Sequence, residues 1–239
     1  MGNPFQVALF TLNLFTSLVR FAKRISATIT IANSFKKNKL KIIIFTLLIQ
    51  NKMKIGYIVF EGITWLDFIG VYDPISRLKS LNYIPDLSWD ICSYTDEVSD
   101  NFGLKMQPTK ICETLENYDA IIIPGGFGTR SLQFNNEFIE WIKTSKDVKH
   151  KISICTGSLI LGAAGFLKDR KATTNYQEYE TLKSYCKEVI KDRIAEDNDI
   201  ISSGAVSVSI DLGLYLCNKW AGEEAKNKIK KQMDYNCNQ

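Results

Sequence analysis

One stretch of the sequence decides the fold, and it reads ISICTGSLILGAAG over residues 152–165. It begins with a short β-branched apolar run that ends at Cys155, and small residues and a helix-compatible run follow. This pattern predicts a strand, a tight turn and a helix, with the cysteine held clear of the sheet as in strained nucleophile elbows. A thiol there lies near a helix N-terminus, where free N–H groups favour its reactive anion. The alternative is a buried cysteine that packs as a small hydrophobic residue.

Outward from this stretch, strands alternate with helices from Met53 onward. The predicted strands cover residues 54–60, 88–95, 118–124, 151–155 and 172–174, with a small hairpin at 97–111 and a paired 193–196 and 200–202. The predicted helices cover residues 65–81 (interrupted at Pro74), 134–145, 156–166, 178–188, 205–220 and 223–233. Strands that are apolar throughout are typical of a parallel sheet with both faces covered. We therefore predict an α/β fold, a flavodoxin-like three-layer sandwich with a mostly parallel sheet between helices.

The first 52 residues differ in composition from the rest of the chain. They contain eight Lys and Arg and no Asp or Glu, whereas the remainder from Met53 carries 22 basic and 26 acidic residues. Three interpretations of this basic extension remain open: a targeting presequence, a membrane anchor, or a segment foreign to the natural protein, which would then start at Met53. Membrane contact and organelle targeting are expected only if residues 1–52 are native.

Composition also excludes several classes of function. The six cysteines show no CxxC spacing and the chain has one histidine, so we expect no metal site. Unpaired thiols in a chain with a large core favour a reducing compartment, which predicts a cytoplasmic protein. Nothing after Met53 forms a basic stripe, so nucleic acid is not an expected partner.

Three features are predicted to meet at one edge of the sheet, where α/β proteins bind their ligands. Cys155 ends one strand, Gly125 and Gly126 end another, and Asp67 lies early in the helix after the first strand. The glycines allow backbone N–H groups to approach a ligand, and a carboxyl group beside a thiolate has a raised pKa. The alternatives are a helix cap for Asp67 and ordinary turn chemistry for the glycines. The single histidine, His150, precedes its strand and is predicted to be a solvated loop residue at the wrong end of the sheet.

The chain also resembles a known family, the ThiJ/PfpI superfamily. The matching blocks lie at 65–70 (WLDFIG), 123–126 (IPGG), 153–158 (SICTGS), 161–167 (LGAAGFL), 171–174 (KATT), 191–193 (KDR), 203–204 (SG) and 210–211 (ID). The Cys-Thr-Gly-Ser-Leu string with its downstream Ala-Thr-Thr is specific to the family, whereas a lone Gly-Gly is not. The resemblance covers residues 53–235, which we take as the catalytic domain, and leaves 236–239 as a tail.

The resemblance implies an activity and a set of roles. It is closest to members that hydrate an isonitrile to an N-substituted formamide, acting on a small molecule as a homodimer without a cofactor. The implied nucleophile is Cys155, the implied acid/base is Asp67, and Thr156 supplies a required hydroxyl. The implied anion pocket uses the backbone N–H groups of Gly126 and Thr156, with Gly125 and Gly157 also at the oxyanion and substrate site.

One position departs from the family pattern. Many relatives carry histidine after Ala-Thr-Thr, whereas Asn175 stands here. A Cys-His peptidase or amidase would lose its base, while a Cys-Asp mechanism tolerates the change. Two other functions remain open: a glyoxalase or deglycase acting on reactive carbonyls, and a non-catalytic sensor in which Cys155 is oxidised.

Overall fold

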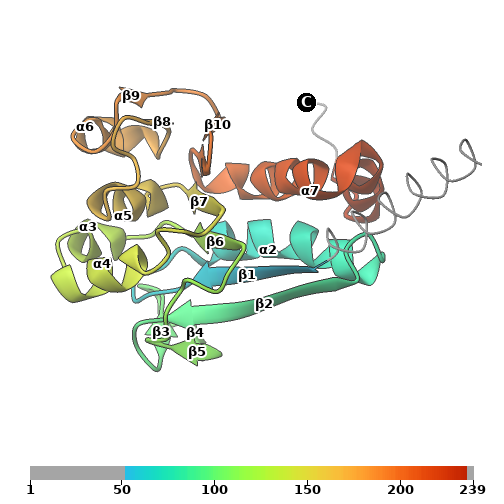
Figure 1. The fold of residues 1–239 in the computed structure, drawn as a ribbon, viewed down its shortest axis with the longest axis horizontal. Helices are drawn as coiled ribbons and strands as arrows, with labels where there is room; N and C mark the ends of the chain where they lie inside the picture. The colour runs from blue at the N-terminus through green and yellow to red at the C-terminus, as the bar shows by residue number, and fades with distance from the viewer. Residues whose placement is uncertain (1–51, 236–239) are drawn as a thin grey trace, which may run out of the picture. The chain divides into compact units, whose positions relative to one another are not determined.

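A computed structural model describes residues 52–235 of the 239-residue chain (Figure 1). The tail at 236–239 and all but the last residue of the predicted basic extension lie outside the described residues. Within the described part, no helix is both long enough and apolar enough to cross a membrane.

The centre of the fold is a seven-stranded sheet in the order β10-β11-β7-β6-β1-β2-β5. Its strands are β1 Lys52–Ile58, β2 Asp86–Ser93, β5 Lys110–Ile111, β6 Ala120–Ile123, β7 His150–Ile154, β10 Ile194–Asp197 and β11 Ile200–Ser203. Two small sheets pair β3 Val98–Ser99 with β4 Lys105–Met106, and β8 Lys171–Ala172 with β9 Glu188–Val189. All neighbours in the main sheet are parallel except β10 and β11.

Helices cover both faces of this sheet. They are α2 Trp65–Ser80, α3 Thr129–Leu132, α4 Asn136–Lys143, α5 Gly157–Ala163, α6 Tyr179–Lys183 and α7 Ser209–Gln232, with 3₁₀ turns η1 Tyr176–Glu178 and η2 Val206–Val208. Tyr57 packs edge-on against both Phe68 and Tyr72 on α2, whereas Phe60 packs edge-on against Phe138 on α4. Helix α2 also packs against α7, whereas α4 packs against α5. The predicted α/β fold is therefore confirmed.

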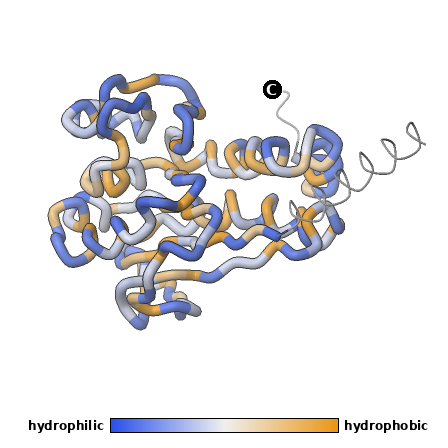
Figure 2. The backbone as a smooth tube through the Cα atoms, viewed as in Figure 1, coloured by the Kyte–Doolittle hydropathy of each residue, from blue (hydrophilic) through white to orange (hydrophobic). Residues whose placement is uncertain are grey.

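The apolar residues gather where these layers meet. Every residue of β6 is buried, and the strands and the inner sides of the helices carry most of the hydrophobic colour (Figure 2). A strand that is buried on both faces has an uninterrupted run of apolar residues, and such runs were the basis for predicting a parallel sheet from the sequence.

The order of the strands determines where the predicted site residues lie. Strands β1, β6 and β7 are neighbours and parallel, so their carboxyl ends meet at one edge. The segments that follow them contain Asp67, Gly125 and Cys155, respectively. Three stretches that are far apart in the chain therefore converge.

Some predicted element boundaries were wrong. Residues 110–111 were predicted to belong to the hairpin at 97–111, but they form β5 and pair with β2 in the main sheet. The helix predicted at 178–188 ends as α6 at Lys183, and its last residue belongs to β9. The first predicted C-terminal helix starts later than expected, at Ser209, but the break between the two is confirmed, because Gly222 interrupts α7 with a φ of 87° in the left-handed region.

Candidate active site

Cys155 occupies the turn between β7 and α5 in a strained backbone conformation. Its φ is +52°, which a residue with a side chain adopts only at a cost. Its N–H donates to the carbonyls of Ser203 at 3.0 Å and Gly204 at 2.9 Å. Its carbonyl accepts from the hydroxyls of Thr174 at 3.0 Å and Ser158 at 3.2 Å. These contacts from three directions hold the elbow that the sequence predicted.

Asp67 reaches this turn from the first residues of α2. The preceding loop is fastened to the loop after β6, because Thr64 N–H donates to Gly125 O at 2.8 Å. In return, Gly125 N–H donates to Asp67 Oδ2 at 2.9 Å. The carboxyl is fully buried, and the hydrogen bond it accepts comes from this neighbouring loop. Asp67 thus faces the strand ends, an arrangement that differs from a helix cap.

Gly125 lies between the carboxyl group and the thiol. A Cβ added at Gly125 would lie 2.8 Å from Asp67 Oδ2 and 2.8 Å from Cys155 Cβ. It would also lie 2.7 Å from Thr156 N. The absence of a side chain here allows the acid and the cysteine to approach each other.

The surroundings of this pair favour protonated states. Burial raises the pKa of Asp67 to about 7, against a smaller lowering by the Gly125 N–H. Asp67 Oδ1 is buried and has no hydrogen-bond partner among the described residues. The pKa of Asp67 is therefore raised, as the sequence predicted, but the main cause is burial of the carboxyl group rather than a neighbouring thiolate.

The thiol itself is not a resting anion. Burial, and then the charge of Asp67, raise the pKa of Cys155 to about 11. Hydrogen bonds from Asn175 and Thr156 lower it only in part. The N–H group of Thr156 at the start of α5 favours the anion, as expected, but desolvation of the buried thiol outweighs it. Near neutral pH the carboxyl group is therefore the member of the pair that exchanges a proton.

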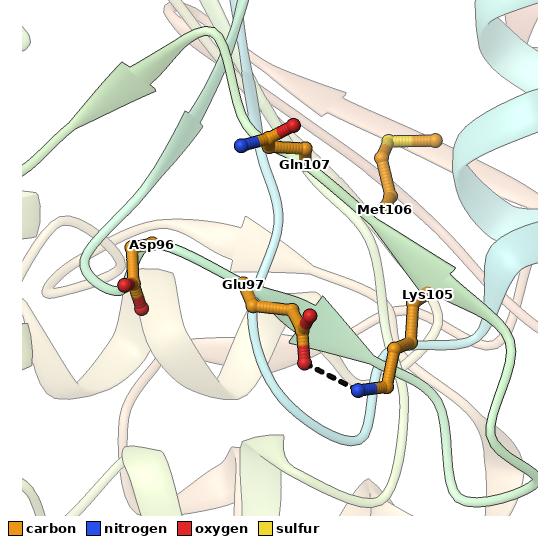
Figure 3. Close-up of a pocket in the computed structure, with 5 residues that line it drawn as sticks. All are labelled: Asp96, Glu97, Lys105, Met106 and Gln107. Carbon is orange, nitrogen blue, oxygen red and sulfur yellow. Dashed lines mark hydrogen bonds and ion pairs between the residues drawn. The ribbon is translucent and has the colours of Figure 1, made fainter.

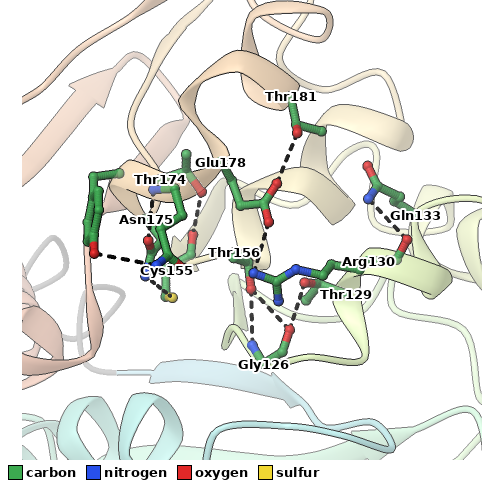
Figure 4. Close-up of polar contacts among 12 residues, drawn as sticks. Gly126, Thr129, Arg130, Gln133, Cys155, Thr156, Thr174, Asn175, Glu178 and Thr181 are labelled. Atoms are coloured by element: carbon green, nitrogen blue, oxygen red, sulfur yellow. Dashed lines mark hydrogen bonds and ion pairs between the residues drawn. The ribbon is translucent and has the colours of Figure 1, made fainter.

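Thr156 and Gly126 form a tight hydrogen-bonded unit beside the elbow (Figure 4). Gly126 N–H donates to Thr156 Oγ1 at 3.0 Å, and Thr156 Oγ1 lies 3.2 Å from Gly126 O. The N–H groups of both Gly125 and Gly126, which were predicted as anion donors, are thus engaged by side chains. An anion pocket that includes them requires Asp67 or Thr156 to move.

Gly157 lies in close contact with the backbone at the end of β6. A Cβ there would lie 2.1 Å from Ile123 O and 2.7 Å from Pro124 O, so α5 starts directly against the end of β6. A role for Gly157 in substrate binding stays a prediction.

Asn175 also belongs to the site, and sequence reasoning noted it only as a departure from a family pattern. Its Nδ2 donates to Cys155 Sγ at 3.5 Å. Its Oδ1 accepts from Gln177 N–H at 3.0 Å and caps η1. Figure 4 shows the Asn175 amide directed at the sulfur, with the Arg130–Glu178 ion pair nearby. Its place directly after Ala-Thr-Thr was the signal available in the sequence.

His150 lies at the start of β7, far along the strand from Cys155. It is half-buried, with its ring 6.3 Å from that of Trp220, so the prediction of a solvated loop residue was wrong. Its predicted position at the other end of the sheet is confirmed.

The rest of the described residues offer neither a metal cluster nor an uncompensated charged hollow beside this site. No group of three or more His, Cys, Asp or Glu side chains there is arranged to hold a metal ion. A hollow of about 250 Å³ lies on the β3–β4 hairpin (Figure 3). Its lining consists of Asp96, Glu97, Lys105, Met106 and Gln107. The charges of Lys105 and Glu97 neutralise each other across 2.6 Å.

Comparison with known proteins identifies the family and the fold of the chain. The model of the DJ-1/PfpI family matches residues 53–219. An isonitrile hydratase from Pseudomonas putida is 29% identical over 185 residues, which cover 77% of this chain and 78% of that protein. Deglycase TK1284 from Thermococcus kodakarensis is 32% identical over 89 residues, covering 37% of this chain and 54% of the deglycase. The crystal structure of a ThiJ/PfpI family protein from Pseudomonas syringae aligns with a TM-score of 0.72 at 24% identity, covering 79% and 77% of the two chains.

Proposed function

Because this chain belongs to the DJ-1/PfpI family, we propose that it is an enzyme that adds water to an isonitrile and releases an N-substituted formamide. One observation carries the proposal. A buried carboxyl group with one unpartnered oxygen and a pKa of about 7 lies beside a cysteine on a strained elbow. Such a pair suits a reaction in which one group attacks and the other moves protons near neutral pH. The isonitrile hydratase from Pseudomonas putida is among the relatives that cover most of the chain.

The reaction begins with transfer of the thiol proton. The Asp67 carboxylate accepts the proton of Cys155, and the sulfur attacks the terminal carbon of the isonitrile. Asp67 then delivers the same proton to that carbon, which gives a thioimidate bound to Cys155. The carboxylate is regenerated, and no redox partner is needed.

Hydrolysis follows at the same carbon. Asp67 accepts a proton from water as the water oxygen attacks the thioimidate, and it passes the proton to the nitrogen. The tetrahedral adduct collapses by breaking the C–S bond, and the hydroxyl proton returns to the sulfur through Asp67. The products are the N-substituted formamide and the free thiol, so the atoms of the isonitrile and one water are all accounted for.

Two further features support an apolar isonitrile as substrate. Three large apolar side chains adjoin site residues in the sequence and remain exposed: Leu66 at 52%, Phe127 at 63% and Tyr176 at 68%. We expect them to contact the organic substituent of the substrate. In addition, Asn175 cannot accept a proton as the histidine of a Cys-His peptidase does. We further expect a cytoplasmic homodimer that works without a cofactor, as the family resemblance implies.

A panel assay tests the proposal. The full chain is incubated separately with cyclohexyl isonitrile, methylglyoxal and a peptide, and the products are followed by proton NMR. We expect N-cyclohexylformamide, its loss in Cys155→Ala, and its retention in the matched control Cys186→Ala. Consumption of methylglyoxal without formamide would instead favour deglycase-type chemistry, after which the Thermococcus relative is named. No turnover of any substrate would favour a cysteine sensor.

A further inference from the structure

We propose that Asn175 is a positioning residue that holds the Cys155 sulfur through a neutral hydrogen bond while leaving proton transfer to Asp67. The inference rests on Cys155 being the nucleophile of the proposed function, but it does not depend on the identity of the substrate. Many relatives carry histidine at the position of Asn175, and the amide has a different role from an imidazole, because it cannot act as a base.

The orientation of the amide is fixed by its own hydrogen bonds. Asn175 Oδ1 accepts the backbone N–H of Gln177 at 3.0 Å, so the other end of the amide, Nδ2, is the one left to face the sulfur at 3.5 Å. An amide that was flipped would place a carbonyl oxygen against the sulfur and would lose the cap of η1. The network therefore selects the donor orientation.

The backbone that carries the amide is tied down on both sides. Before it, Thr174 Oγ1 donates to Cys155 O at 3.0 Å. After it, Glu178 N–H donates to Asn175 O at 2.9 Å, and the Glu178 carboxylate pairs with Arg130 at 2.8 Å. Thr181 Oγ1 donates to the same carboxylate at 2.9 Å. The segment that presents Asn175 is thus anchored to the elbow, to α3 and to α6.

The chemistry of an amide explains what this contact does. Its N–H₂ group donates to a thiolate and so favours the charged form, but the amide neither ionises nor takes up a proton in the pH range of the experiment. Asp67 on α2 is the ionisable group that acts on the Cys155 thiol, while the nearby Arg130 and Glu178 are paired with each other. Proton exchange at the sulfur therefore runs through Asp67 alone. An imidazole at residue 175 would add a second titrating group.

The test replaces the amide by groups of similar shape and different chemistry. Asn175→Asp keeps an oxygen to accept the Gln177 N–H, since Asp and Asn cap about equally well, but it loses the donor and adds a negative charge. Asn175→His keeps a hydrogen-bond donor at this position, but its imidazole also titrates near neutral pH. The matched control is Asn135→Asp, because Asn135 Oδ1 likewise accepts a backbone N–H, that of Phe138 at 3.1 Å, at the start of α4. The measurements are the rate of Cys155 alkylation by iodoacetamide from pH 6 to 10 and a thermal melt.

For Asn175→Asp we expect the alkylation profile to move by about 1 pH unit or more to higher pH, so that alkylation at pH 8 is about tenfold slower or worse, with little change in melting temperature. For Asn175→His we expect a new limb in the alkylation profile near pH 6–7, and for Asn135→Asp a profile identical to wild type. An Asn175→Asp profile that overlays the wild-type profile would overturn the inference. Should Asn175→Asp fail to fold, Asn175→His decides, with a wild-type profile as the contradicting result.

The outcome separates this inference from the proposed function. If the wild-type protein produces no formamide but the alkylation profile shifts as expected, the hydratase proposal fails and the role of Asn175 stands. If formamide is produced and the profile does not shift, the function stands and the inference fails.

Discussion

The buried carboxyl of Asp67 is the residue whose environment says most about the chemistry. Free carboxyl groups are rarely left buried without a second hydrogen-bond partner, and those that are tend to mark functional sites. Here Oδ2 is held by Gly125 N–H and Oδ1 is unpartnered among the described residues. The arrangement sacrifices stability to keep a proton-exchanging group next to Cys155.

Replacing Asp67 by Asn should therefore separate activity from stability. We expect kcat/KM to fall about 10²–10⁴-fold, because the amide cannot move a proton. Burial raises the pKa from 3.8 in the unfolded chain to about 7, so ionisation in the folded state opposes folding. This cost begins above pH 4 and is complete above pH 7. Asn removes it, so the free energy of unfolding should rise at pH 8–9, by about 4 kcal/mol at most, and change little at pH 4.

Urea melts at the two pH values, run beside the kinetics, check this expectation. Equal stability changes at both pH values would contradict the buried-acid account. Wild-type turnover in the variant would remove Asp67 from the mechanism.

Gly125→Ala should disable the site without changing a reactive group. The new methyl would lie 2.7–2.8 Å from Thr156 N, Asp67 Oδ2 and Cys155 Cβ, which forces the acid and the cysteine apart. We expect at least a 100-fold loss of kcat/KM, consistent with the cost of a displacement of about 1 Å at reacting groups. The matched control is Gly204→Ala, whose methyl would approach nothing closer than 3.7 Å and should retain more activity. Equal activities of the two variants would show that the spacing at Gly125 does not matter.

At the scale of elements, the packing of α2 against α7 orients the start of the helix that carries Asp67. A Cβ added at Gly70 would lie 2.1 Å from Ser209 Oγ and 2.7 Å from Ser209 Cβ. At the next crossing point, Gly213 packs against Pro74. The two helices therefore approach each other through small residues at both contacts.

Gly70→Ala should destabilise the protein by forcing this contact open. Overpacking of this kind typically costs about 1–3 kcal/mol in the free energy of unfolding. Chemical denaturation measures it, with Gly204→Ala as a control that introduces no clash. A Gly70→Ala variant as stable as wild type would mean that α2 and α7 can separate freely.

The sequence predicted elements well where the strand or helix pattern lies within one stretch of residues. It predicted them poorly where an element forms only by pairing with a distant segment of the chain. Residues 152–165 predicted a strand, turn and helix because the apolar run, the cysteine and the small residues are adjacent. The end of α6 was missed because β9 forms only by pairing with β8, where Ile190 N–H donates to Ala172 O at 2.8 Å. The contact of Asn175 with the sulfur was missed for the same reason, since its place after Ala-Thr-Thr marks the residue but does not identify Cys155 as its partner.

At the scale of the whole molecule, the hydrophobic core of the described residues begins where the match to the family begins, at Met53, and extends past its end at residue 219. The buried core cluster runs from Met53 to Ile229. The first strand begins at Lys52, which pairs with Asp86 at the start of β2. The sheet edge that holds the site is therefore built by residues after the basic extension.

A chain that starts at Asn51 should fold and keep its activity. We expect its melting temperature and kcat/KM to match those of the full chain, because β1 and the core are retained. Calorimetry and the formamide assay on both chains check this. An insoluble or inactive short chain would mean that residues 1–50 complete the domain.

The central claim is that Cys155 and Asp67 work as one proton-exchanging pair, and the pH dependence of kcat/KM for cyclohexyl isonitrile tests it most directly. The Asp67 carboxylate must be ionised to take the thiol proton, and burial raises its pKa to about 7. We therefore predict that kcat/KM of the wild-type enzyme rises with pH through about 7 and then levels off. In Asp67→Asn the residual rate should lack this limb. A wild-type profile that is flat from pH 5 to 9, or a limb that persists in Asp67→Asn, would contradict the account.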